Sequence, residues 1–353
     1  DLMNSAAQDL RASGGDVCGV MSNTNFGTNV LTNNFDPDVL DGWGVRPSDW
    51  NFTATLQQQI GPRASLDVTY TRRWFRGFSA ADNLALAPAD LTPFTIVAPS
   101  DPRLPGGGGY VVSGLYNVVP GKAGLVDNLI ADSDTFGAWT QHFDGIDVTV
   151  SMRSVKGVTL AGGTSTGETI ADNCGVRGRL PELATTTTGT SAFGPGLGGS
   201  AVTPSSPYCH VNYGVLTQVR GFTAYTIPKA GIEVAAAFQS KPGPMLAANY
   251  AAPSAAAEPS LGRPLSGGAA NVTVNLIAPG TMYAPRINQL DVRAGKTLAY
   301  RRTRSRLALD VFNLFNSSAV LSYDTSFVPN GSWLQPQSIL TPRLFKLSAE
   351  IDF

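Results

Sequence analysis

Three strings of residues match the letters of catalytic or nucleotide-binding motifs, and none has the context that its chemistry needs. Gly163 to Gly167 reads GTSTG, the pattern of a serine nucleophile elbow, which requires a strand-to-helix turn and a histidine–acid pair. Gly194 to Gly199 has the glycine spacing of a dinucleotide-binding loop but follows a Thr/Ser/Gly tract rather than a strand. Gly295-Lys296-Thr297 matches the end of a phosphate-binding loop but has Leu290 in place of its first glycine. We therefore predict no catalytic residue and no enzyme activity.

Residues that bind metals are scarce and scattered. The chain has two histidines and three cysteines, whereas a structural zinc site clusters three or four such ligands. We predict neither a metal site nor a cofactor. The acidic side chains are expected to form ordinary ion pairs with Arg and Lys on a wet surface.

The composition excludes several classes of protein. Charged residues make up 14% of the 353 residues, against about 25% in a typical soluble protein, and the net charge of -1 gives no basis for binding nucleic acid. The 38 glycines and 24 prolines are spread along the chain and argue against a helical bundle. No run of apolar residues is long enough for a transmembrane helix.

The strongest pattern is alternation of apolar and polar residues, which gives a strand one apolar and one polar face. It predicts nine strands, near 50–59, 63–74, 140–153, 157–167, 214–226, 231–239, 286–300, 304–312 and 343–353. The residues assigned to the apolar face include Ile146, Val148, Val150, Met152, Leu66, Val68, Tyr70, Phe222, Ala224, Ile232, Val234, Ala236, Phe238, Leu307, Leu309 and Val311.

The connections between these strands alternate between short turns and long loops. Turns rich in Gly, Pro and polar residues join four pairs of strands, while the loops at about 75–136, 168–213, 240–285 and 313–342 are long and are expected to be irregular. Compact soluble domains rarely repeat loops of this length, whereas outer-membrane barrels have short periplasmic turns and long extracellular loops. We predict an all-β protein, an antiparallel transmembrane β-barrel with long extracellular loops.

Nine strands cannot close a bacterial barrel, because barrels of a single chain have an even number of strands. Either a tenth strand precedes Trp50 or the chain is the C-terminal portion of a larger barrel. We expect the latter, with residues 1–49 as an extracellular loop region and residues 50–353 as part of the barrel. The plug and the N-terminal strands would then lie upstream.

Two cysteines share one extracellular loop in this arrangement. Cys174 and Cys209 are 35 positions apart, and the cell exterior is oxidising, so we predict a disulfide between them, with two free thiols as the alternative. Cys18 has no evident partner.

Aromatic residues gather in or beside the first long loop. They could grip a ligand or stack on a sugar, but an aromatic girdle at the membrane interface is the simpler interpretation. These residues are Tyr110, Tyr116, Phe136, Trp139 and Phe143.

Several segments resemble TonB-dependent outer-membrane receptors. The closing segment 343–353, with Phe345, Leu347, Ile351 and Phe353, is similar to the C-terminal signal read by the barrel assembly machinery. Leu309 to Asn316 (LDVFNLFN) is similar to the penultimate-strand motif of these receptors. Residues 36–44 (DPDVLDGWG), 101–110 (DPRLPGGGGY) and 260–275 resemble the Oar-like branch, whose members carry a carboxypeptidase-regulatory-like domain at the N-terminus.

The resemblance implies a function in transport. Such receptors are 22-stranded barrels around a plug, located in the outer membrane and energised by the TonB complex, and they take up a small ligand that the sequence does not identify. Partners would be outer-membrane lipid, the TonB complex acting through a plug that is not in this chain, and the assembly machinery. The alternatives are a structural or adhesin-like barrel without active transport, and a secreted all-β carbohydrate-active protein.

Overall fold

A computed structural model of the chain describes residues 33–352, except for residues 44, 185–206, 228 and 301–302. Cys18, the Gly194–Gly199 string and Phe353 lie outside the described residues. The described chain is all-β, with three short α-helices, and no helix in it is long and apolar enough to cross a membrane.

Nine long strands form one antiparallel sheet, in which each strand pairs with the next one in the chain and the short strand β10 (His210–Asn212) pairs with β9. All nine strands predicted from the sequence are present, so the predicted all-β antiparallel fold is confirmed. Among the described residues, β2 and β20 form the two edges. The long strands are β2 (Ser48–Gly61), β3 (Ala64–Arg76), β8 (Thr140–Val155), β9 (Val158–Asp172), β11 (Leu216–Ile227), β12 (Ile232–Lys241), β15 (Ile287–Tyr300), β16 (Thr303–Phe312) and β20 (Leu344–Asp352).

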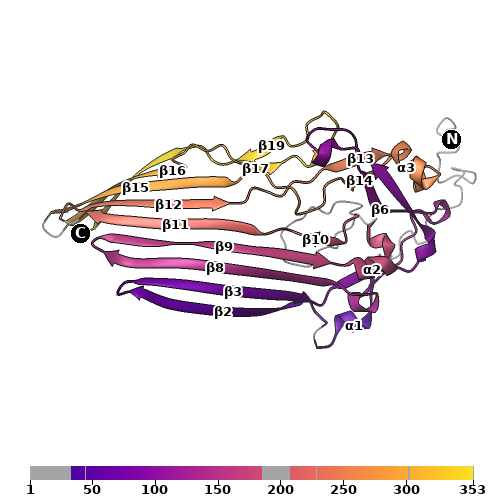
Figure 1. Cartoon of the computed structure of the whole chain (residues 1–353), viewed down its shortest axis with the longest axis horizontal. Coiled ribbons are helices and arrows are strands. Elements are labelled where there is room, and N and C mark those ends of the chain that lie inside the picture. Colours follow the sequence, from indigo (N-terminus) through magenta and orange to yellow (C-terminus); the bar gives the residue numbers. More distant parts are fainter. Residues whose placement is uncertain (1–32, 44, 185–206, 228, 301–302, 353) are drawn as a thin grey trace, which may run out of the picture.

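The strands run along the long axis of the molecule, with the short turns at one end and the long loops at the other (Figure 1). The short turns fall where glycine, proline and polar residues predict them. At one of these turns Lys156 and Gly157 both have positive φ angles of 49° and 87°, which hairpin turns need and which glycine adopts without strain.

The loops are folded, and the expectation of long irregular segments is wrong for their described parts. They form further small sheets: β1 (Asn33–Phe35), β7 (Asn128–Asp132) and β4 (Ser79–Asn83); β5 (Leu91–Val97) and β6 (Val111–Val118); β14 (Asn271–Asn275), β13 (Asn249–Pro253) and β18 (Ser326–Phe327); β17 (Val320–Tyr323) and β19 (Pro336–Ile339). They also hold α1 (Pro37–Leu40), α2 (Cys174–Arg179) and α3 (Ser254–Leu261), and 3-10 turns at Pro88–Asp90, Pro105–Gly107, Pro120–Lys122, Ser133–Thr135, Pro181–Ala184 and Ser266–Gly268.

We call this folded region the loop cap. It consists of residues 33–43 and 45–47 and of four loops: the first at 77–139, the second at 173–184 and 207–215, the third at 242–286 and the fourth at 313–343.

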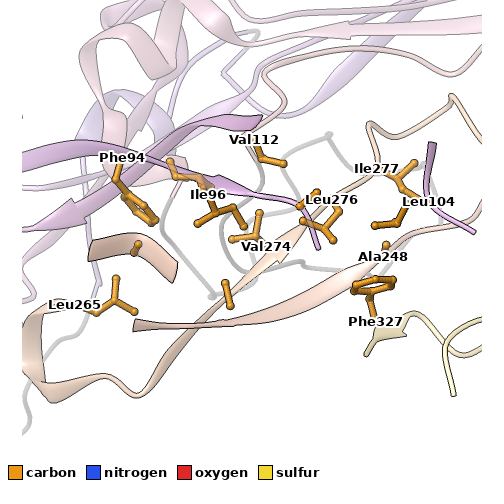
Figure 2. Close-up of a cluster of buried hydrophobic side chains, with 14 of the residues drawn as sticks. Phe94, Ile96, Leu104, Val112, Ala248, Leu265, Val274, Leu276, Ile277 and Phe327 are labelled. Carbon is orange, nitrogen blue, oxygen red and sulfur yellow. The ribbon is translucent and has the colours of Figure 1, made fainter. Parts of the chain in front are cut away.

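The loop cap has a hydrophobic core that joins three loops distant in sequence. Figure 2 shows Ile96 and Val112 of the first loop beside Val274 and Leu276 of the third. The fourth loop contributes Phe327 and Trp333. The other members are Phe94, Ala98, Leu104, Leu115, Ala248, Ala252, Ala257, Leu261, Leu265 and Ile277. A second, smaller cluster joins the first and second loops through Phe78, Ala80, Trp139, Val176 and Leu180.

Candidate functional site

The register of the long sheet separates its side chains into two faces, because directly paired residues of neighbouring strands point to the same side. Val68 pairs with Val148, and Val234 pairs with Ala294. Ala294 pairs in turn with Leu309, and Leu309 pairs with Leu347. These residues form the apolar face.

Large apolar side chains on the apolar face are exposed. Leu347 is 84% exposed, Trp50 67% and Leu56 67%. The others on this face include Phe52, Ile60, Tyr70, Trp74, Ile146, Leu160, Tyr225, Val234, Phe238, Leu298, Leu307, Leu309, Phe345 and Ile351. An apolar surface that continues across so many strands marks contact with lipid or with another protein.

The opposite face is polar and carries ion pairs and hydrogen bonds between strands. Arg73 holds Asp49 through two hydrogen bonds of 2.8 and 2.9 Å, Arg306 holds both carboxylate oxygens of Glu233 at 2.9 Å, and Arg293 lies 3.5 Å from Asp310. Hydroxyl pairs join Thr55 to Thr69 at 3.0 Å and Ser65 to Ser151 at 2.8 Å. Asp49, Glu233 and Asp310 thus form the ion pairs that the sequence predicts for a wet surface.

One assignment of faces from the sequence is wrong. Phe222 pairs with Ala161 and Ala237, and Ala237 pairs with Asp291, so Phe222 and the next residue on its face, Ala224, lie on the polar face. Strand β11 carries both apolar and polar residues on each of its two faces. Only its pairing with β9 and β12 shows which of them belongs to the apolar face of the sheet.

A pocket of about 670 Å³ lies at the centre of the polar face, where β8, β9, β11, β12 and β15 run side by side. We call it the central pocket. Its polar lining includes Asp147, Ser165, Arg220, Gln239, Gln289 and Asp291. Sequence analysis does not identify this pocket, because its residues come from five strands that are adjacent only in the sheet.

The GTSTG string lies inside strand β9, which continues to Asp172, five residues beyond the strand end predicted at residue 167. Ser165 pairs with Asp147 on β8 and Gln218 on β11, and the string meets no strand-to-helix turn. Its glycines have structural roles. A Cβ atom on Gly163 would come within 2.1 Å of the Val148 carbonyl oxygen, and one on Gly167 would meet the ring of Phe143 at 2.6 Å. Gly295 to Thr297 likewise lies within β15.

The aromatic residues of the first loop mostly stabilise the loop cap. Tyr110 packs against the larger core and donates a hydrogen bond of 2.8 Å to the Leu276 carbonyl oxygen. Trp139 stacks on Phe78 with ring centroids 5.1 Å apart, and Phe136 packs beside them. Phe143 lies over Gly145 and Gly167 on the polar face. For these residues, packing replaces the girdle that we expect from the sequence.

Aromatic residues do occur at the loop end of the apolar face. Trp50 and Trp74 pair directly across β2 and β3, and the Arg72 guanidinium lies 5.1 Å from the centre of a Trp74 ring. Next to them the Tyr70 hydroxyl donates a hydrogen bond of 2.7 Å to Asp144. Amphipathic rings of this kind are typical of the boundary between an apolar and a polar medium.

The segment DPRLPGGGGY forms a joint between the first and fourth loops. Asp101 has 1% of its side chain exposed and accepts hydrogen bonds from Arg103 Nη2 at 2.7 Å and from the backbone N–H of Asn330 at 3.1 Å. Arg103 also donates to the carbonyl oxygens of Gly331 and Trp333 at 3.1 and 2.9 Å. The Arg103 guanidinium and these N–H donors hold the pKa of Asp101 well below its usual range.

The lowered pKa of Asp101 predicts that its contribution to stability depends on pH. Because the pKa of Asp101 is lowered by folding, its contribution is present above the ordinary carboxyl pKa of about 4 and is lost as the pH falls through the folded pKa. The difference in thermal stability between the wild type and Asp101→Asn should therefore shrink on acidification. Tryptophan fluorescence of the melting transition measures it. A difference that stays constant with pH for Asp101→Asn would contradict the assignment.

The other segments that carry the resemblance also lie at joints. Asp36 accepts a hydrogen bond of 2.9 Å from the backbone N–H of Asp38 and begins α1. Arg263 follows α3 and donates to Asn117 Oδ1 at 2.7 Å and to the Val118 carbonyl oxygen at 3.0 Å. Asn313, after β16, donates to the carbonyl oxygens of Ser317 and Thr341, each at 2.9 Å. These motifs therefore stabilise the loop cap and its connection to the sheet.

Cys174 and Cys209 are joined by a disulfide, the pairing that the sequence analysis expects. The bond ties the start of α2 to the residue before β10, and the backbone N–H of Asn173 donates to the Cys209 carbonyl oxygen at 3.0 Å. The disulfide thus fastens the second loop beside the end of β9.

Removal of this disulfide should destabilise the second loop. The 35-residue separation corresponds to about 3–4 kcal/mol on the chain-entropy model. Paired Cys174→Ser and Cys209→Ser substitutions should make residues 173–184 more sensitive to protease, while the long strands keep their protection. Alkylation followed by mass spectrometry checks the bond itself. Two free thiols in the oxidised wild type would contradict it.

The residues proposed from sequence as an assembly signal lie on β20 at the edge of the sheet. Phe345, Leu347 and Ile351 share the apolar face and are 62%, 84% and 55% exposed. Within the described residues, no group of three or more His, Cys, Asp or Glu side chains is placed to hold a metal ion.

No protein-family model and no curated protein matches the chain. Among solved structures, the chain is similar to the outer membrane transporter YddB from Escherichia coli, with 10% sequence identity and a TM-score of 0.41. The alignment covers 86% of this chain and 32% of that one, so the chain spans about a third of the transporter's length.

Proposed function

We propose that this chain forms part of an outer-membrane β-barrel receptor that takes up a small ligand. The loop cap would receive the ligand outside the cell, and the polar face of the sheet would line the lumen through which it passes. The observation that carries the proposal is the two-faced sheet. Its nine strands expose apolar side chains on one side and paired charges and amides on the other.

A membrane environment accounts for both faces. Lipid tails would cover apolar side chains such as Leu56 and Leu347, whose exposure to water would be unfavourable by roughly 25 cal/mol per Å². The ion pairs Arg73–Asp49 and Arg306–Glu233 would face a wet lumen, as in porins and related barrels. Lipid cannot satisfy the backbone of an open edge, so the proposal requires that β2 and β20 pair with further strands.

The folded loop cap supports a role in recognition. Binding residues of barrels lie in loops that a rigid scaffold positions, and the loop cap has a core of its own that holds its surface in one arrangement. We infer that uptake is energised by the TonB complex through a plug domain outside this chain. The support for this step is the set of receptor-like segments, including Asp101 to Tyr110 and Leu309 to Asn316.

The barrel is tested by heat modification. The full-length protein, purified from outer membranes in detergent, should migrate faster on a gel before boiling than after it, because a closed barrel resists unfolding by the gel detergent. Unchanged mobility, together with solubility in the absence of detergent, would contradict the proposal and favour a secreted all-β protein.

Energised uptake needs a separate test. Cysteine cross-linking in cells should capture the full-length protein with TonB through its N-terminal region, and the yield should rise when ligand is present. A heat-modifiable barrel that never cross-links to TonB would instead be a structural or adhesin-like barrel without active transport.

A further inference from the structure

We propose that the central pocket binds a neutral, hydroxyl-rich ligand, an oligosaccharide chain that stacks on Phe222. The inference rests on the proposed function in one respect, namely that the polar face lines a lumen that a ligand can enter. Three features of the pocket carry it: an exposed aromatic ring, a floor of small residues and a rim of amides.

Phe222 is an exposed aromatic ring on a polar surface. Its side chain is 45% exposed, and its direct neighbours on the same face are Ala161 and Ala237, which leave the ring uncovered. The face of an aromatic ring carries negative charge density and attracts the C–H groups on the flat side of a sugar ring. On a water-exposed face whose other interactions are ion pairs, an exposed phenylalanine has no comparable role.

The floor of the pocket around this ring is bare. Gly163 pairs with Thr149 and with Arg220, and a Cβ atom on Gly163 would overlap the Val148 carbonyl oxygen at 2.1 Å. Together with Ala161 and Ala237, this glycine keeps side chains away from the backbone of β9 and β12. A flat ligand can therefore lie against the sheet beside Phe222.

The rim offers groups that both donate and accept hydrogen bonds. Gln239 Nε2 donates to Gln289 Oε1 at 2.9 Å, and Gln289 Nε2 donates to Asp291 at 3.0 and 3.1 Å. The backbone N–H of Asn313 holds Asp291 at 2.7 Å. Each amide has two N–H donors and two acceptor lone pairs, more than these bonds use. Hydroxyl groups also donate and accept hydrogen bonds, so a ligand rich in hydroxyl groups can pair with this preorganised row of amides.

The charges of the pocket favour a neutral ligand. Arg73, Arg293 and Arg306 on the same face each form an ion pair, whereas neither Arg220 nor Asp147 has one among the described residues. Arg220 donates a hydrogen bond of 3.0 Å to Gln218 and keeps further donors. With Asp147 and Asp291 the lining holds two carboxylates against one guanidinium, which disfavours a phosphate or another anion.

The test measures sugar binding by the full-length protein in detergent, using titration calorimetry with maltopentaose, cellopentaose and xylopentaose. At least one neutral sugar should bind the wild type, and Phe222→Ala should weaken that binding by about tenfold or more, the usual effect of losing an aromatic stacking platform. Tyr225→Ala is the matched control. Tyr225 is 40% exposed on the same strand but lies on the apolar face, away from the pocket, so its loss should leave binding unchanged.

A second pair of variants tests the floor of small residues by enlarging a side chain instead of removing one. Ala237→Leu should block the pocket and abolish binding, while Ala236→Leu, on the apolar face, should not. The proposal is overturned if no neutral sugar binds, if both members of a pair behave alike, or if only an acidic oligogalacturonide binds. Heat modification separates the two proposals. If the protein is heat-modifiable but binds no sugar, only the pocket proposal is refuted. If it binds sugar in a way that depends on Phe222 but its gel mobility does not change on boiling, only the barrel proposal is refuted.

Discussion

Lysine in place of Val148 should destabilise the protein in a bilayer by about 2–4 kcal/mol, because the residue lies in the middle of β8 on the apolar face. Val148 pairs with Val68 and Thr164, which offer no anion to the new charge. Val234 lies two residues from the start of β12, nearer the turn end, so Val234→Lys should cost less, since the penalty falls towards the membrane interface.

Thr149 provides the control for this prediction. It follows Val148 on the same strand but points to the polar face, where a lysine finds water, so Thr149→Lys should change stability by only about 0.5 kcal/mol. The measurement is reversible urea unfolding of the full-length protein in lipid vesicles, followed by the heat-modification shift. Equal tolerance of lysine at positions 148 and 149 would show that the apolar face does not meet lipid.

Replacing Trp333 by alanine should unfold much of the loop cap, at a cost of about 3–5 kcal/mol. Trp333 is 2% exposed, and its indole N–H donates to the Ala247 carbonyl oxygen at 2.9 Å. Its ring meets Phe327 edge-on with centroids 5.1 Å apart, and the Arg103 guanidinium lies 5.4 Å from a ring centroid. The side chain therefore joins the fourth loop to both the first and the third.

Hydrogen exchange of the detergent-solubilised protein measures this effect. Trp333→Ala should raise exchange in residues 91–118 and 246–277, which share the core, while the long strands stay protected. Trp43→Ala is the control, because Trp43 is 101% exposed and should contribute little. Increased exchange confined to residues 326–336 would mean that the loops do not fold as one unit.

The candidate site is predictable from sequence only in part. The polar side of each strand follows from alternation, and the prediction of ion pairs on it is confirmed by Arg306 and Glu233. The central pocket is not predictable, since Asp147 and Gln289 are 142 positions apart and meet only because five strands lie in register. Phe222 is misassigned for the same reason, because its face is defined by Ala161 and Asp291 on other strands.

The sequence by itself determined the nine long strands, the turns between them and the pairing of Cys174 with Cys209, because alternation, turn chemistry and a shared loop are local properties of the chain. Only the tertiary structure decided that the long loops fold. Their core residues, such as Ile96, Val274 and Trp333, are separated by loops and strands and show no common period. Burial of apolar area depends on which segments meet in space, and that information is not present in any one stretch of sequence.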